Sequence, residues 1–282
     1  MKSIPLDQLP QWSPWPSRLL GITPWTVPRR TLEKVTSEYD QDKFARCLDY
    51  CKGLGAPATP EDVRRFEMGG DGARKVCVSQ GDELFEVSLE ESRALYDSLL
   101  HDTLGPLLAD VRTVVELGAG YGYNLWSLRR RFGRASFVGG ELSPNAVAVA
   151  ERLYRGQEGL SVRPFNFYDP ASYALVSTAE PPVLVFTSYA LEQLTHAAPF
   201  LDGLRSCRRS LKSVVLFESL YDEDGRTLLS QLRRRYTEVN DYNRDLYAEL
   251  SRQPDLRISS CLRNVFGQNP LHAISLVQWM FL

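Results

Sequence analysis

Histidine and cysteine are scarce in this sequence, and their scarcity excludes a common class of site. The 282 residues include three histidines, and the five cysteines are scattered without a CxxC pair. Neither residue type has the close spacing of a zinc site, so no metal is expected. The thiols are expected to be reduced and mostly buried.

A strong net charge and long apolar runs are also missing. The sequence has 33 Lys and Arg against 35 Asp and Glu, a formal net charge of −2. This balance gives no basic surface for nucleic acid or for an anionic membrane. No window of about 18 apolar residues could form a membrane span. The start MKSIPLDQLPQW has prolines and polar residues where a signal peptide would be apolar. We therefore expect a cytoplasmic protein without membrane or nucleic-acid partners.

The first 30 residues are instead rich in proline and tryptophan. Proline at this density is expected to prevent regular helix and sheet. The tryptophans indicate that the segment nevertheless docks on an apolar surface. The residues concerned are Pro5, Pro10, Pro14, Pro16, Pro24, Pro28, Trp12, Trp15 and Trp25.

Two helices and two short strands are predicted next. The helices cover 37–54 and 88–108, and the strands cover 75–79 and 84–87. The second helix opens with the capping box Ser88-Leu89-Glu90-Glu91. We treat residues 1–109 as a smaller, mainly helical N-terminal region that forms a cap or substrate region.

From residue 110 to 282 apolar strands alternate with amphipathic helices, which indicates an α/β fold with a parallel sheet covered on both faces. The last two strands, 258–265 and 274–281, are joined by a stretch too short for a crossover helix, so they must be antiparallel. The earlier strands are predicted at 111–117, 136–140, 160–164, 183–187 and 213–218. The helices are predicted at 123–132, 144–154, 171–178, 190–211 and 226–240, with an interruption of 190–211 at Pro199.

The first of these strands runs into the glycine-rich stretch VVELGAGYGYNLWSL, residues 114–128. A dinucleotide fingerprint, G-x-G-x-x-G, would place its third glycine where Tyr123 stands. A phosphate loop would need a lysine, and this turn has none. The pattern therefore favours a nucleoside without phosphates.

Two acids suit such a ligand. Glu141 ends the second strand, in GGELSP, where a carboxylate can accept hydrogen bonds from both ribose hydroxyls. Glu116 lies one residue before the end of the first strand and can face a positively charged ligand. After the third strand, Asn166 could accept a hydrogen bond from an adenine amine and Phe167 could cover the ring.

The segments ELGAGYG, GGEL, NF and FTSYALEQ, with the closing antiparallel strand, resemble the class I S-adenosylmethionine-dependent methyltransferases over roughly residues 90–282. FTSYALEQ and NPLHAISLVQW also look like bacterial small-molecule methyltransferases of specialised metabolism. The resemblance implies a Rossmann-like seven-stranded sheet with the last strand antiparallel, and S-adenosyl-L-methionine across the carboxyl ends of the strands. The family often has Asp where Asn166 stands. The residues expected to bind this methyl donor are Glu116, Gly118, Ala119, Gly120, Tyr121, Asn124, Glu141, Leu142, Asn166, Phe167, Thr187 and Ser188.

The acceptor is expected beside the loops that follow the fourth and fifth strands. Glu192 could orient a cationic nitrogen or act as a base, and Tyr189 could offer a ring face to a cation. A first-turn acid that favours the helix dipole is an equal alternative for Glu192. The substrate-binding candidates are Glu218, Tyr242, Asn243 and Asn269, although 240–243 also reads as a turn before a new helix.

The predicted function is methyl transfer to a small molecule. Carboxylates can fork onto a guanidinium, which slightly favours N-methylation of an amine or guanidine such as a free amino acid. An O-methyltransferase for a sugar or natural-product hydroxyl is the alternative, and a non-catalytic binding scaffold is a third reading. The tryptophans and the helix 88–108 are hypothesised to form a lid or wall over the acceptor pocket. The same region is a candidate contact in a homodimer.

Overall fold

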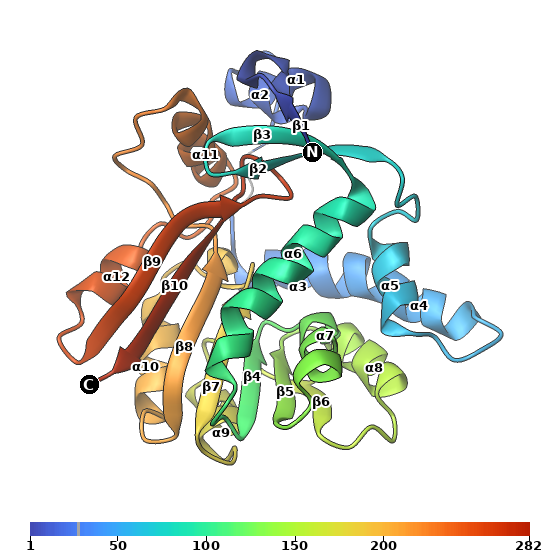
Figure 1. Ribbon diagram of the computed structural model, residues 1–282, viewed down its shortest axis with the longest axis vertical. Helices are drawn as coiled ribbons and strands as arrows, with labels where there is room; N and C mark the ends of the chain where they lie inside the picture. The colour runs from blue at the N-terminus through green and yellow to red at the C-terminus, as the bar shows by residue number, and fades with distance from the viewer. Residues whose placement is uncertain (27–28) are drawn as a thin grey trace.

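A computed structural model describes residues 1–26 and 29–282, so Pro28 of the proline-rich segment lies outside the described residues. Its centre is a seven-stranded sheet in the order β6-β5-β4-β7-β8-β10-β9 (Figure 1). β10 is antiparallel to both of its neighbours, as the sequence predicted, and β4 to β8 are parallel. The strands are β4 (Thr113–Leu117), β5 (Ser136–Glu141), β6 (Leu160–Pro164), β7 (Val183–Ser188), β8 (Leu211–Glu218), β9 (Leu256–Phe266) and β10 (Ile274–Phe281).

The central strands are mostly apolar and almost completely buried because helices cover both faces of the sheet. Val114 packs into the core on one face, and its neighbours Val115 and Leu117 pack into the core on the other. This is the two-residue alternation of a strand. The covering elements are α7 (Tyr123–Phe132), α8 (Pro144–Leu153), η4 (Pro170–Tyr173), α9 (Ala174–Ser177), η5 (Leu191–Gln193), α10 (Ala198–Ser206), α11 (Leu228–Val239) and α12 (Leu246–Arg252).

One predicted helix, 190–211, is two separate elements. Residues 191–193 form the single turn η5, and α10 begins only at Ala198. Pro199 lies in the first turn of α10, where a missing N–H costs nothing, so it starts the helix instead of interrupting it. The chain is already in β8 at Leu211.

Two helices of the N-terminal region, α5 and α6, begin with a capping box. Thr59 and Asp62 cap α5, and Ser88 and Glu91 cap α6 as predicted. The predicted helix 37–54 starts earlier, at Leu32, and its middle is a π-helical stretch. The elements are α3 (Leu32–Thr36), η2 (Ser37–Phe44), α4 (Ala45–Gly53), α5 (Pro60–Glu67), β2 (Lys75–Gln80), β3 (Glu83–Ser88), α6 (Leu89–Leu104) and η3 (Gly105–Leu107).

The proline-rich start is more regular than predicted. Residues 2–4 form β1, which pairs antiparallel with β3, and the short helices η1 (Leu6–Gln8), α1 (Leu9–Trp12) and α2 (Trp15–Leu19) follow. Pro10 and Pro16 lie in first helical turns, which tolerate proline. The expected apolar docking is present, since Trp15 meets the Tyr236 ring edge-on at 4.6 Å between centroids.

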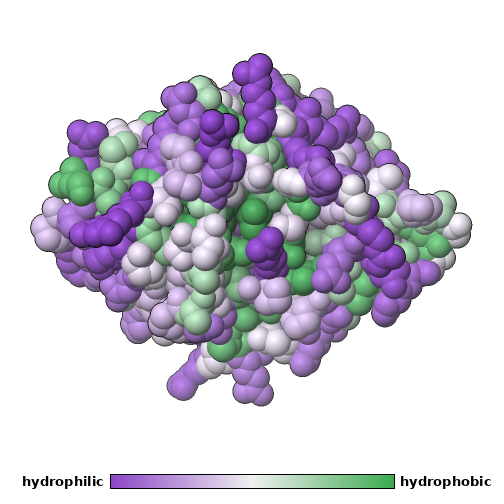
Figure 2. Space-filling view, turned by 90° about the horizontal axis from the view of Figure 1, so that it is seen from below, coloured by the Kyte–Doolittle hydropathy of each residue, from purple (hydrophilic) through white to green (hydrophobic). Residues whose placement is uncertain are grey.

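Helices α3 to α5 lie above the carboxyl ends of β4 and β5, at the end of the sheet where a ligand binds in such folds, and α6 runs from that end down across one face of the sheet (Figure 1). The opposite end, seen from below in Figure 2, is rimmed by hydrophilic side chains with apolar ones between them. None of the helices in the described part of the chain has the length and apolar composition that crossing a bilayer requires.

Candidate active site

A cavity of about 380 Å³ lies between the glycine turn after β4 and the N-terminal helices. It reaches from the ends of β5 and β6 to the end of β7. Thr187 is fully buried beneath it and does not line it. The other sequence-predicted donor residues all border the cavity: Glu116, Gly118, Ala119, Gly120, Tyr121, Asn124, Glu141, Leu142, Asn166, Phe167 and Ser188.

The glycine turn needs its glycines for both backbone and space. Gly118 and Gly120 have φ values of +81° and +55°, a region that other residues rarely adopt. A Cβ atom on Gly118 would also collide with the side chain of Ala190, which follows β7. The turn is therefore held close to the end of β7, and its backbone can approach a ligand.

Glu141 at the end of β5 is held by backbone N–H groups. Its Oε2 accepts a hydrogen bond from the Gly120 N–H at 2.7 Å, and its Oε1 accepts one from the Ser143 N–H at 2.8 Å. Burial raises the pKa of this carboxyl, and the two hydrogen bonds oppose the shift. Each oxygen keeps a further lone pair, which suits the two hydroxyls of a ribose.

Glu116 at the end of β4 is almost completely buried. Its Oε1 accepts a hydrogen bond from Asn124 Nδ2 at 2.7 Å, and its Oε2 has no partner among the described residues. Burial raises the pKa of Glu116 to about 8, the charge of Glu141 adds to the shift, and the Asn124 hydrogen bond opposes it. A cationic ligand would supply the missing partner and favour the ionised form.

The segment that closes the cavity, here called the lid, comprises Leu32–Phe44. The cavity is lined by several of its residues, including Tyr39, Asp40 and Phe44. Asp40 Oδ1 accepts hydrogen bonds from the Ser143 hydroxyl at 2.6 Å and from the Asn145 N–H at 2.9 Å. No motif in the sequence ties the lid to the start of α8, so sequence reasoning missed it.

The two parts of the N-terminal region that were hypothesised to form a wall of the pocket differ in position. Tyr96 on α6 does line the cavity, and its hydroxyl lies 2.7 Å from the Ser188 hydroxyl. Trp12, Trp15 and Trp25 are not among the cavity residues of the described chain. They belong instead to the contacts around α11, where Trp15 packs on Tyr236.

The two acids expected at the acceptor lie behind the cavity wall. Glu192 is 4% exposed and Glu218 is fully buried, and neither lines the cavity. Glu218 accepts a hydrogen bond from the Ala190 N–H at 3.1 Å. Burial and the nearby charge of Glu218 raise the pKa of Glu192 well above its usual range.

Glu192 therefore has a structural position, contrary to the expected role of pairing with a cationic acceptor. Its Oε1 accepts a hydrogen bond from Gln193 Nε2 at 3.3 Å, and the same amide donates to the Tyr39 hydroxyl at 3.2 Å. His272 Nε2 lies 3.7 Å from Glu192 Oε2, and burial lowers the pKa of this histidine to about 3. Tyr189 does line the cavity, with a φ of 52° and its hydroxyl donating to the His272 carbonyl at 3.1 Å.

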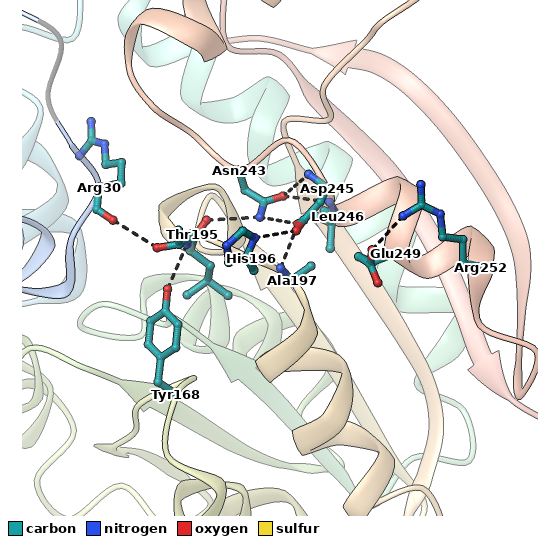
Figure 3. A network of polar contacts seen from close by, with 11 residues as sticks. Arg30, Tyr168, Thr195, His196, Ala197, Asn243, Asp245, Leu246, Glu249 and Arg252 are labelled. Carbon is teal, nitrogen blue, oxygen red and sulfur yellow. Dashed lines mark hydrogen bonds and ion pairs between the residues drawn. The ribbon is translucent and has the colours of Figure 1, made fainter.

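Tyr242 and Asn243 lie away from the cavity. Asn243 Oδ1 accepts hydrogen bonds from the Asp245 and Leu246 N–H groups at 3.1 and 2.9 Å, which orders the start of α12 (Figure 3). This is the turn before a new helix that the sequence offered as an alternative. Tyr242 stacks on His272 at 4.8 Å and borders a second cavity of about 260 Å³.

The loop between β9 and β10 contributes Gln268 instead of Asn269. Gln268 lines the cavity, and its Nε2 donates to the Ser92 hydroxyl at 3.4 Å. The Asn269 side chain closes the hairpin by accepting from the Leu271 N–H at 3.1 Å. The residues described contain no group of three His, Cys, Asp or Glu side chains placed to hold a metal.

Comparison with solved structures identifies the fold. The mitomycin 7-O-methyltransferase MmcR matches 96% of this chain and 69% of its own, with 14% identity and a TM-score of 0.50. The pyocyanin biosynthetic protein PhzM matches 96% of this chain and 68% of its own, with 16% identity and a TM-score of 0.53. No family model and no curated protein sequence matches the chain. The chain has the Rossmann-like fold of the class I S-adenosylmethionine-dependent methyltransferases.

Proposed function

We propose that this protein is an S-adenosyl-L-methionine-dependent methyltransferase with a small-molecule acceptor. The observation that carries the proposal is a cavity over the glycine turn that holds the buried carboxyls of Glu116 and Glu141 side by side with apolar walls. Glu141 matches a ribose, the unpartnered Oε2 of Glu116 matches a cationic centre, and Leu142 and Phe167 provide apolar surface for a purine.

The bound donor would supply an activated methyl group, and the chain would supply position and a dry site. The lid closes the cavity through Asp40, which excludes water from the reacting groups. Tyr189 and Ala190 follow β7 beside the glycine turn, so an acceptor resting there would lie next to the donor. Holding two reactants in this way accounts for a large share of the rate of such displacements.

We further propose that the acceptor is not a cation, which favours a hydroxyl over an amine or guanidine. The preference for nitrogen rested on Glu192 and Glu218, and both are buried away from the cavity. The carboxylates that do line the described cavity are engaged elsewhere. Asp40 binds Ser143, and Glu67 pairs with Lys43 at 2.7 Å. Glu116 and Glu141 are assigned to the donor.

Two measurements test the function. Calorimetry should show that S-adenosylhomocysteine binds with micromolar-scale affinity, on the order of −8 kcal/mol. Mass spectrometry should then detect methylated products when the protein and donor are mixed with a panel of hydroxyl compounds, amines and guanidines. Absence of nucleoside binding would contradict the proposed function. Binding without any methylated product would favour a scaffold, and methylation confined to amines or guanidines would contradict the hydroxyl preference.

A further inference from the structure

The guanidinium group of Arg93, on α6, has no carboxylate partner among the described residues. In the described chain its Nη2 is buried without a hydrogen-bond partner, and no acidic side chain lies within 4.0 Å of it. Its Nε donates only to the thioether of Met68, at 2.8 Å. A thioether is a weak acceptor, and a buried N–H group such as that of Nη2 normally has a hydrogen-bond partner. The side chain therefore has an unused capacity to bind an anion.

Arg93 lies directly behind one end of the cavity. Met68, its contact, lines the cavity, and so does Arg64. Burial lowers the pKa of Arg93, the positive charge of Arg64 lowers it further, and the negative charge of Glu67 opposes the shift. Arg64 forms a bidentate pair with Asp97 at 2.7 and 2.9 Å.

The charges around this end do not cancel. Lys43 is offset by Glu67, and Arg64 is offset by Asp97. Arg93 adds a third positive charge that forms no ion pair in the described residues, and the negative charge that acts on it, that of Glu67, is already paired with Lys43. Arg64 also stacks over the Tyr123 ring at 4.1 Å, which fixes its position. The end of the cavity lined by Arg64 and Met68, with Arg93 behind it, is therefore electropositive.

We propose that Arg93, beside Arg64, forms an anion subsite that binds a carboxylate of a molecule held in the cavity. Exchange of the Met68 sulfur for a carboxylate would replace a weak contact with a charge-assisted hydrogen bond. Met68 is flexible enough to move aside. The carboxylate belongs either to the amino-acid part of the methyl donor or to the acceptor. Because both are ligands of the proposed methyltransferase, the inference rests on the proposed function.

Calorimetry on variants separates the two sources. The full chain is titrated with S-adenosylhomocysteine and with its decarboxylated analogue, using wild type, Arg93→Met and Arg93→Lys. Arg130→Met is the matched control, because Arg130 is an exposed arginine on α7 that pairs with Glu61. The protein saturated with S-adenosylhomocysteine is then titrated with a panel of small carboxylates, each beside its neutral amide. Circular dichroism checks that each variant is folded.

If the donor supplies the carboxylate, Arg93→Met should weaken S-adenosylhomocysteine binding by about 10- to 100-fold and leave the decarboxylated analogue unchanged. If the acceptor supplies it, Arg93→Met should leave S-adenosylhomocysteine binding unchanged and remove the preference for a carboxylate over its amide. In both cases Arg93→Lys retains part of the effect, and Arg130→Met behaves as wild type.

The subsite is overturned if wild type and Arg93→Met bind S-adenosylhomocysteine equally and no carboxylate is preferred over its amide. It is also overturned if Arg130→Met shows the same loss as Arg93→Met. Failure of wild type to bind S-adenosylhomocysteine at all would instead overturn the proposed function, so the two failures are distinguishable.

Discussion

Asp40 and Ser143 are 103 residues apart in the sequence, and the Ser143 hydroxyl donates a 2.6 Å hydrogen bond to the Asp40 carboxylate. The same oxygen of Asp40 accepts from the Asn145 N–H at the start of α8. Ser143 also donates its backbone N–H to Glu141, the expected ribose acid. The lid is therefore tied to the wall that would hold the donor, and we expect donor binding to depend on this contact.

Asp40→Ala should weaken donor binding. The substitution removes two hydrogen bonds to a charged group, and such bonds typically contribute about 1.5–3 kcal/mol each. Because the lid can relax after the loss, we expect the affinity for S-adenosylhomocysteine to fall by about 10-fold or more. Asp42→Ala is the control, because Asp42 is exposed and pairs only with Arg46 in the same helix. Equal affinities for the two variants in calorimetry would show that the lid does not depend on Asp40.

Glu141→Gln and Glu141→Ala should differ in their effects. Glutamine keeps one acceptor oxygen but loses the charge and puts an amide N–H group against the Gly120 or Ser143 N–H. Alanine leaves both N–H groups without their partner. We expect each variant to lose about 1.5–3 kcal/mol or more of donor binding. Titration calorimetry measures the affinity, and a thermal melt shows how far the glycine turn itself has been destabilised. Unchanged affinity in Glu141→Ala would remove this residue from the donor site.

Glu116 should make the stability of the protein depend on pH. Burial raises its folded-state pKa to about 8, above the ordinary value of 4.5. The stabilising contribution of its protonated form is therefore fully present below about pH 4.5 and is lost as the pH rises through about 8. Glu116→Gln cannot ionise, so its melting temperature should exceed that of wild type by a margin that widens from pH 5 to pH 8 and then levels off. Melts across this range measure the margin, and a constant difference would contradict the raised pKa.

Glu192→Gln should leave methyl transfer nearly normal. The Glu192 side chain is buried away from the cavity and accepts a hydrogen bond from Gln193, and glutamine has the same size and can accept the same hydrogen bond. An acid that paired with a cationic acceptor would instead cost about 2–5 kcal/mol when removed, with turnover falling by tens to thousands of fold. Steady-state kinetics with an acceptor found in the mass-spectrometric panel decides between these outcomes. Glu192→Ala is the contrast, because it leaves Gln193 and Tyr39 without that support.

The sequence by itself was enough for the architecture and for most of the expected donor site. Strand and helix periods are local properties, and the short link between 258–265 and 274–281 leaves no room for a crossover, so the antiparallel end of the sheet follows from chain length alone. Residues such as Glu116, Gly118 and Glu141 directly follow or end parallel strands. Parallel strands bring their carboxyl ends to one edge, which is why these residues meet in one cavity.

Only the tertiary structure decided which other side chains reach that cavity. Glu192 occupies a position after β7 where an acid could face the acceptor, but it is buried against Glu218 and His272 and its pKa is raised. In the last hairpin, Gln268 lines the cavity while its neighbour Asn269 closes the turn. The two residues are adjacent and both carry amides, so the sequence did not indicate which of them would reach the cavity. The lid contact between Asp40 and Ser143 joins segments distant in the chain, and such contacts depend on how the elements pack and not on local propensity.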